Sequence, residues 1–226
     1  MFVAQNLSAC KQHVYVFDRT GETILPKQLL GAQGYFPNAE TGIYIIRTTF
    51  TTLLRDPAEE TTIDFLAPVA LQLSEKYLVL RLVSLEKNLS SYFERPCYVA
   101  GRSIEERDIL REVYGLTSGV TDVHKGIKKL WQEAAIDSPR AKFKKPKSMA
   151  SEAMDEELGI REHNPELYEV LAESVLLNAL FTVSDEEKMG VSHFSLNFTE
   201  GYLAFPSYSA VGGTDNVIAA ILERNS

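Results

Sequence analysis

The first hundred residues have the hydrophobic pattern of β-strands. Residues 13–17 (HVYVF) and 42–50 (GIYIIRTTF) are rich in β-branched and aromatic side chains, which half-buried strands favour. In residues 77–85 (YLVLRLVSL) apolar side chains fall on both faces of an extended chain, which indicates a central strand. Pro68 interrupts the run 62–73, so we expect an edge strand or a bend there. The polar turn after residue 17 also predicts a hairpin, with residues 22–25 as its second strand.

After residue 101 the pattern becomes helical. Ser103 and Glu106 have the spacing of a capping box, which predicts a short helix over 104–114 that stops at Gly115. A second helix is expected from about Thr121 to a break at 137–139 (DSP). Its apolar positions share about a third of the helix circumference, and they are Val123, Ile127, Leu130, Trp131 and Ala134. The remaining arc carries His124, Lys125, Lys128 and Lys129.

The last third of the chain mixes predicted helices with a hairpin. Residues 151–162 and 165–181 are predicted as helices, the second capped by Asn164 and opened by Pro165. Residues 192–198 (SHFSLNF) alternate apolar and polar side chains and predict a hairpin with residues 202–205. A final helix is expected from about Asp215 to Arg224.

The expected fold class is therefore α+β, with a mostly antiparallel N-terminal sheet, a helical middle, and a C-terminal β-hairpin and helix. We expect a β-rich region at residues 1–101 and a helical region with the C-terminal hairpin at 102–226, with one continuous domain as the alternative.

Composition agrees with a globular chain that has no membrane partner. Of its 226 residues, 45% are hydrophobic and 24% charged, which is enough apolar surface for a substantial core. The longest apolar runs, 65–73 and 175–183, are about half of the ~20 residues that a membrane-spanning helix needs. The N-terminus lacks the pattern of a secretory signal, and Cys10 and Cys97 form no C-x-x-C pair. A cytoplasmic, reduced location is the expectation.

Charge divides the chain more sharply than its total of −8 suggests. Residues 102–148 contain 11 basic and 7 acidic side chains, whereas residues 149–226 contain 3 basic and 14 acidic ones. Eight of the 23 Lys and Arg residues lie between 120 and 147. The chain thus has a basic middle and an acidic end.

Nucleic acid, with DNA favoured, is the first candidate partner. A short helix, a turn with glycine, a basic amphipathic helix and a basic arm follow one another in the order of a winged helix-turn-helix. The second helix would present Lys125, Lys128 and Lys129 to a duplex. The arm would supply Arg140, Lys142, Lys144, Lys145 and Lys147. Phe143 would pack beneath the arm or stack on a base. This hypothesis describes a non-catalytic regulatory or accessory protein.

Other interpretations of the same stretch stay open. A helix with one apolar and one basic face is most often a solvated surface helix. Residues 152–173 hold eight acidic side chains and one basic one, so the basic middle could meet them within the chain. Alternatively the chain is a protein-interaction module or homo-oligomer in which the basic middle of one copy meets the acidic helices of another.

A metal-dependent nuclease is the third hypothesis. Glu186 and Lys188 have the E-x-K spacing with which such enzymes place a carboxylate on a cation, and Asp64 could complete the set. The context SDEEKMG favours a loop, whereas the chemistry needs a strand. The four histidines have no metal-ligand spacing and no G-x-S-x-G is present, so we expect no catalytic residue, metal or cofactor.

Overall fold

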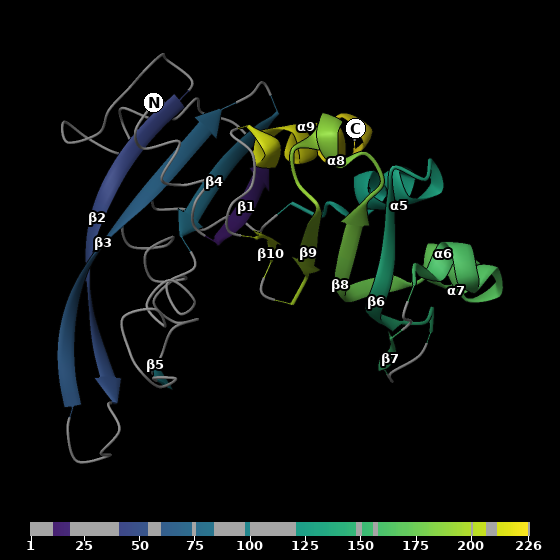
Figure 1. Ribbon diagram of the computed structural model, residues 1–226, viewed down its shortest axis with the longest axis horizontal. Helices are drawn as coiled ribbons and strands as arrows, with labels where there is room; N and C mark the ends of the chain where they lie inside the picture. Colours follow the sequence, from purple (N-terminus) through teal and green to yellow (C-terminus); the bar gives the residue numbers. More distant parts are fainter. Residues whose placement is uncertain are drawn as a thin grey trace. The chain divides into compact units, whose positions relative to one another are not determined.

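The computed structural model describes residues 11–18, 41–53, 60–73, 76–83, 98–99, 121–147, 151–155, 158–199, 201–206 and 212–225 (Figure 1). They fall into two compact units. One contains the described residues between Cys10 and Val120, and the other contains those from Thr121 onward. Both units contain antiparallel sheet, and the second also contains helices, so the fold class is α+β as predicted.

The first unit is an antiparallel sheet. Its strands are β1 (Gln12–Asp18), β2 (Thr41–Leu53), β3 (Glu60–Leu73), β4 (Tyr77–Val83) and β5 (Tyr98–Val99). They are ordered β5-β2-β3-β4-β1. Every pairing is antiparallel, which confirms the predicted N-terminal sheet. The predicted strand at 22–25, the helix over 104–114 and both cysteines lie outside the described residues.

Strand β4 is central, as its two-faced apolar pattern predicted. It lies between β3 and β1, and Leu78, Val79 and Leu80 are all buried. Burial also lowers the pKa of Arg81 on this strand to about 10, because the charged guanidinium loses solvation.

Strand β3 is not an edge strand, which corrects the first of the two alternatives predicted from Pro68. It pairs with β2 along its length and with β4 from Val69 onward. Pro68 therefore lies one residue before the two-sided part of the strand, where its missing N–H costs no ladder bond to β4.

The second unit combines a five-stranded antiparallel sheet with helices. Its elements are α5 (His124–Gln132), β6 (Ile136–Lys144), β7 (Ser151–Asp155), α6 (Ile160–His163), α7 (Pro165–Glu173), β8 (Val175–Val183), α8 (Glu186–Met189), β9 (His193–Asn197), β10 (Tyr202–Phe205) and α9 (Gly213–Asn225). The strand order is β10-β9-β8-β6-β7, and every pairing is antiparallel. Within the described ranges, no helix is both long and apolar enough to cross a membrane.

Two predicted helices are wrong in part, because sheet pairing takes over their residues. Residues 151–155 form β7, an antiparallel partner of β6. Among the described residues of the first prediction, only 160–162 are helical, as part of α6. The second helix begins as predicted, with Asn164 accepting a hydrogen bond from the Leu167 N–H at 3.1 Å and with Pro165 in its first turn. It ends at Glu173 because Ser174 is extended and β8 follows.

The helix α5 is shorter than predicted. It begins at His124 and ends at Gln132, before the DSP segment that was expected to stop it. The turn is made by Ala134, which has a left-handed backbone conformation with φ of 60° and lies outside the helix. The predicted apolar face of α5 is confirmed at four positions, because Val123, Ile127, Leu130 and Trp131 are buried.

The C-terminal hairpin and helix are confirmed. Strands β9 and β10 pair through a turn closed by Gly201, whose φ of 78° favours glycine. The helix α9 follows at Gly213–Asn225.

The core of this unit is built on a row of aromatic rings. Phe181, Phe194 and Phe205 lie on adjacent strands, with ring centroids 5.3 and 5.7 Å apart along the row. Trp131 of α5 contacts Phe181 edge-on at 5.5 Å. The helix α5 therefore covers the face of the sheet that carries these rings.

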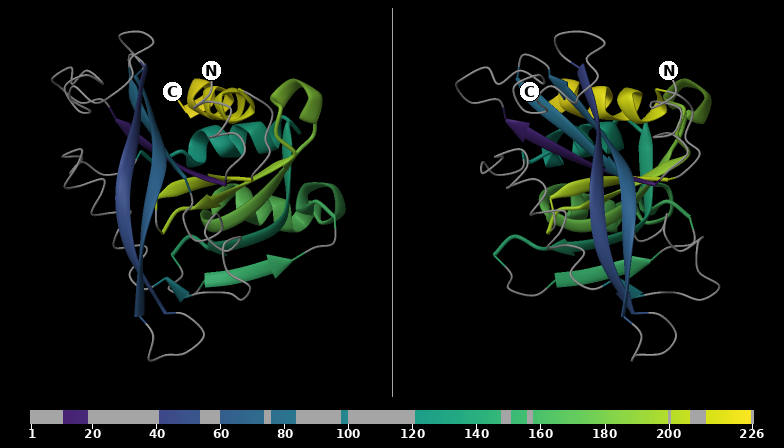
Figure 2. Two further views of the ribbon diagram at one scale, coloured as in Figure 1. Left: turned by 60° about the vertical axis from the view of Figure 1, so that its left-hand side comes forward. Right: turned by 90° about the vertical axis from the view of Figure 1, so that its left-hand side faces the viewer.

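The helices α5 and α9 lie side by side (Figure 2) and approach closely at Gly126. A Cβ added to Gly126 would lie 2.1 Å from the backbone oxygen of Ile221. The Gly126 N–H donates to the side-chain oxygen of Asn225 at 3.0 Å, so α9 supplies an acceptor that the N-cap residue Val123 cannot provide.

We expect Gly126→Ala to lower the free energy of unfolding by about 1–3 kcal/mol. In a helix interior alanine is otherwise more stabilising than glycine by about 1 kcal/mol. The sign of the measured change in unfolding free energy therefore tests whether the two helices approach closely at this residue. Urea denaturation measures the change, with Lys125→Ala on the same helix as the near-neutral control. A stabilised Gly126→Ala protein would contradict the contact. Adding Ile221→Val should not rescue it, because the clash is with a backbone atom.

Candidate nucleic-acid interface

The predicted basic arm is an inner strand of the sheet, not an extension from it. Strand β6 lies between β7 and β8. Ala141 and Phe143 are fully buried, so the intervening Lys142 points to the other face of the sheet and is exposed. Arg140 is likewise exposed, and Lys144 is half-buried.

The positive charge continues into the turn after β6. Lys145 and Lys147 are exposed there, and Lys147 has a left-handed backbone conformation. The cations of this segment are held on a strand and a tight turn, so they keep a fixed spacing. We call Lys142, Lys144, Lys145 and Lys147 the lysine row.

The segment that carries the lysine row contains no acidic residue. No acidic residue occurs between Asp137 and Glu152. Lys142 and Lys144 are opposite Ala153 and Ser151 of β7, which are uncharged.

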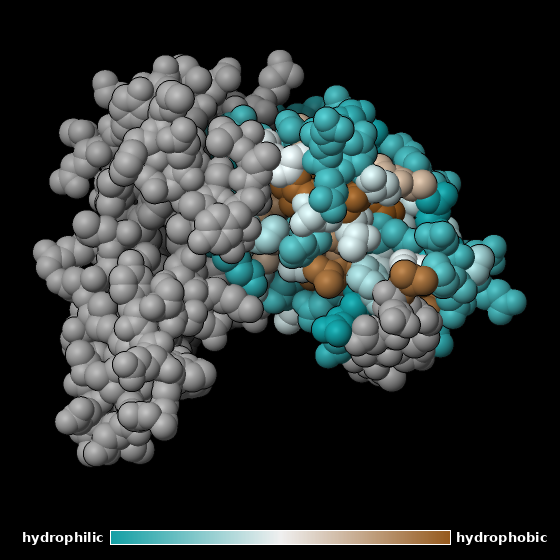
Figure 3. All heavy atoms as spheres, viewed as in Figure 1, coloured by the Kyte–Doolittle hydropathy of each residue, from teal (hydrophilic) through white to brown (hydrophobic). Residues whose placement is uncertain are grey.

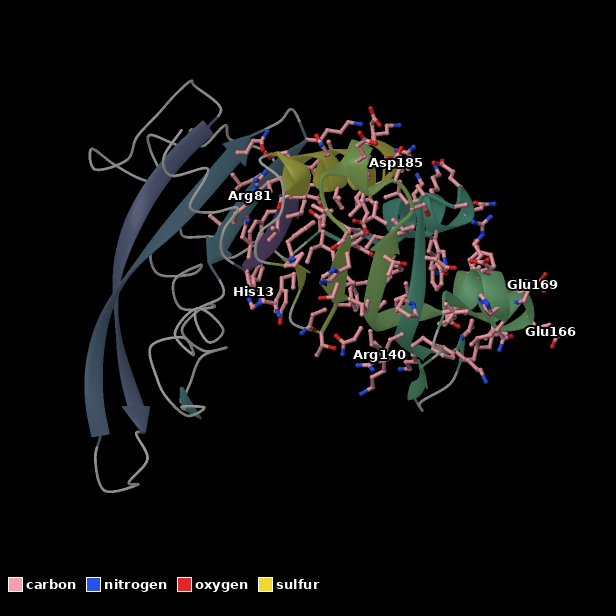
Figure 4. The ribbon with its side chains drawn as sticks, in the orientation of Figure 1. His13, Arg81, Arg140, Glu166, Glu169 and Asp185 are labelled. Atoms are coloured by element: carbon pink, nitrogen blue, oxygen red, sulfur yellow. The ribbon has the colours of Figure 1, made fainter. Side chains whose placement is uncertain are left out.

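The remaining cation of the strand has a different neighbour. Arg140, whose side chain Figure 4 shows at the margin of the unit, is opposite Asp155 in the register of β6 and β7. Part of the acidic segment 152–173 thus meets the basic middle by forming strand β7.

Lys128, predicted to contact DNA, makes a contact within the unit. Its Nζ donates to the backbone oxygen of Ser174 at 2.7 Å, at the C-terminal end of α7. A cation suits this position because the last carbonyls of a helix carry partial negative charge. Burial lowers the pKa of Lys128, and the nearby Asp122 carboxylate partly opposes that change. Lys125 and Lys129 are exposed.

His124 is buried, which corrects its expected place on the exposed basic arc. Its Nε2 lies 2.7 Å from the Leu176 backbone oxygen, and its Nδ1 lies 2.5 Å from Asp122 Oδ1. Burial acts to raise the pKa of Asp122, but the hydrogen bonds from His124 and the charges of His124 and Lys128 hold it below its usual value. The group therefore fastens the start of α5 to β8.

The helix cations and the lysine row do not form one surface. Trp131 places α5 over the aromatic face of the sheet, and Lys142 extends from the opposite face, because its neighbours on β6 are buried. The first helix of the helix-turn-helix hypothesis lies outside the described residues.

Phe143 belongs to the core. Its side chain is 0% exposed, so it packs beneath the basic strand, and the alternative of stacking on a base is wrong.

A polar row that the sequence did not reveal extends from Lys142 across the sheet. Lys142 is opposite Asn178 of β8, Asn178 is opposite Asn197 of β9, and Asn197 is opposite Tyr202 of β10. Directly opposed residues of antiparallel strands share a face. Asn178 was hidden by the predicted helix over 165–181. The signal that could have found it is the segment 181–183 (FTV), at the end of the predicted helix and just beyond it, because its aromatic and β-branched side chains favour a strand.

The nuclease motif does not lie on a strand. Glu186 and Lys188 are in α8, a single turn capped by Asp185, which accepts from the Lys188 N–H at 3.0 Å. Residues two apart on a helix do not face each other. Asp64 is in the first unit. Among the side chains that the structure describes, no cluster of three His, Cys, Asp or Glu residues could hold a metal ion.

The acidic side chains of the second unit gather on its short helices. Glu166 and Glu169 project outward from α7 (Figure 4), and Glu162 and Glu173 are exposed as well. In Figure 3 the visible face of this unit is mostly hydrophilic, with smaller hydrophobic areas between. The unit thus presents acidic helices and a separate basic strand.

Fold and site together define an α+β protein with a basic, polar sheet face. No protein-family model matches the chain, and no curated protein matches its sequence.

Proposed function

We propose that the chain binds nucleic acid through the lysine row, as a non-catalytic regulatory or accessory protein. One observation carries the proposal: four lysines within six residues extend from a paired strand and its turn, in a segment without acidic residues. Phosphate contacts of this kind supply most sequence-independent affinity for nucleic acids. An acidic protein gains from such a local site, because its net charge of −8 repels nucleic acid elsewhere.

The number of lysines sets the expected salt dependence. If about four phosphates are neutralised, log affinity for a duplex should fall against log salt with a slope of about −3.6. This slope corresponds to a loss of about two decades between 50 and 200 mM salt. Binding that does not depend on salt would contradict the proposal.

We expect Lys142→Glu/Lys147→Glu to weaken binding strongly and to reduce the salt slope by about 1.8, since each phosphate contact contributes about 0.9. Fluorescence anisotropy titrations at about 50 and 200 mM salt measure both quantities. The matched control is Lys125→Glu/Lys129→Glu, which changes the net charge equally but lies on α5, over the opposite face of the sheet. Equal effects of the two double variants would show that only total charge matters, and would exclude the lysine row as the site.

A second candidate function is self-association. The exposed carboxylates of α6 and α7 favour it, because the lysine row of one copy and the acidic helices of another are complementary. Sedimentation at low and high salt distinguishes the two functions. A salt-dependent dimer that binds no nucleic acid would favour the second.

A further inference from the structure

The outer face of the second unit's sheet offers hydrogen-bonding groups and a ring in line with the lysine row. Asn178 is exposed, and Asn197 and Tyr202 are half-buried. Asn197 Nδ2 donates to the Tyr202 hydroxyl at 3.2 Å, which fixes the phenol ring relative to the amide. Starting from Lys142, the row passes through two amides and ends at an aromatic ring.

We infer that the ligand of this face is single-stranded nucleic acid, with its backbone on the lysine row and its bases laid across β8, β9 and β10. The inference rests on the function proposed above and adds the class of nucleic acid. Three strand spacings separate β6 from β10, or about 14 Å. Unpaired bases that turn away from the lysine row would therefore lie over the two amides and reach the ring.

The chemistry of the row suits bases that have left a duplex. Amide side chains can donate to and accept from the edges of a base, and a phenol ring can stack on its face. The phenol ring can stack only on a base whose face is not covered by a neighbouring base. In a duplex the base faces are stacked inside, so a duplex would leave this ring without a base to stack on.

The neighbouring row adds little charge beside the amides. Arg140 is opposite Leu180, Leu180 is opposite Ser195, and Ser195 is opposite Ala204. Arg140 is therefore the one charged residue among these four. Leu180 and Ser195 are half-buried, whereas Ala204 is buried, so the partly exposed apolar surface against which a base can pack lies on β8 and β9.

The charge pattern favours a nucleic acid over an acidic protein on this face. An acidic protein would be held by the lysine row alone. The adjoining amides match the mixed donors and acceptors of bases, whereas an ionised carboxylate only accepts, and the phenol ring can stack on a base.

Tyr202→Leu tests the inference, with Tyr202→Phe as its matched control. Affinity is measured for a labelled single strand of about 16 nucleotides and for a duplex of the same length. We expect Tyr202→Leu to weaken single-strand binding about 5- to 150-fold, the effect of losing one stacked base, and to leave duplex binding and the salt slope unchanged. Tyr202→Phe retains the ring and should bind as the wild type does. Because Asn178 is exposed, Asn178→Ala offers a second variant that leaves the core intact, and it should also weaken only single-strand binding.

The outcomes separate this inference from the proposed function. Salt-dependent binding in which the duplex binds as tightly as the single strand, or in which Tyr202→Leu and Asn178→Ala both bind the single strand like the wild type, overturns the inference alone. If Tyr202→Leu does not fold, Asn178→Ala decides the question. No binding of either nucleic acid at low salt overturns the proposed function itself.

Discussion

Replacing Trp131 by alanine is expected to lower the free energy of unfolding of the second unit by about 3–5 kcal/mol. The side chain is 1% exposed and contacts Phe181 of β8 and Tyr168 of α7, with centroids 5.5 and 5.3 Å away. Its Nε1 donates to Asp137 Oδ1 at 2.9 Å. Alanine would leave a cavity between three elements and remove this donor.

Far-ultraviolet circular dichroism in urea measures this loss. Fluorescence does not serve, because Trp131 is the one tryptophan of the chain. Trp131→Phe is the control: it keeps a ring in the cavity but lacks the N–H, and should cost less, about 1–3 kcal/mol. A loss below about 1 kcal/mol for Trp131→Ala would contradict the tight packing, since buried large-to-small changes cost more than that.

Asp137 explains why Trp131 is held so firmly. The same carboxylate accepts from the Ser138 N–H at 2.7 Å and from the Arg161 N–H at 3.1 Å. It thereby joins the start of β6 to the short helix α6. A Cβ on Gly159 would lie 2.0 Å from Asp137 Oδ2, so a larger residue where α6 begins would displace this carboxylate. One acidic residue, expected from the sequence to break a helix, thus organises the start of β6, and the lysine row lies at the other end of this strand.

Local patterns predicted the parts of the fold whose cause is local. The apolar stripe of α5, the Asn164 cap and the alternation in residues 192–198 each depend on neighbours a few residues away. The run 175–183 has no such cause. A short apolar segment suits a buried helix or a buried strand equally, and here β6 and β9 on either side decide for a strand.

The candidate site was predictable to the same extent. The sequence RAKFK alternates cations with apolar residues, which favours a strand with one basic face, and β6 has that form. The roles of His124 and Lys128 could not be predicted, because their acceptors Leu176 and Ser174 are 52 and 46 residues away. Both residues lie in a sequence that is typical of a basic surface helix, but their side chains contact backbone oxygens within the unit.

The second large effect is expected at Phe143, on the strand that carries the start of the lysine row. Phe143→Ala should lower the free energy of unfolding by about 3–5 kcal/mol. Phe143 is 0% exposed, between Lys142 and Lys144, and it is opposite Leu176 of β8. Removing the ring empties the core directly under the row. Urea denaturation again measures the loss, and exposed Lys142→Ala on the same strand is the near-neutral control.

Phe143→Leu separates the structural role of this ring from a role in binding. Leucine retains most of the apolar volume, so the variant should remain folded at a lower stability. If Phe143 only packs the core, nucleic-acid affinity below the melting temperature should equal that of the wild type. If it stacked on a base, affinity would fall by about 5- to 150-fold, the value expected for Tyr202. We therefore expect Tyr202→Leu to weaken single-strand binding and Phe143→Leu to leave it unchanged, because Phe143 and Tyr202 lie on opposite faces of one sheet. Equal losses for Phe143→Leu and Tyr202→Leu would contradict that assignment of faces.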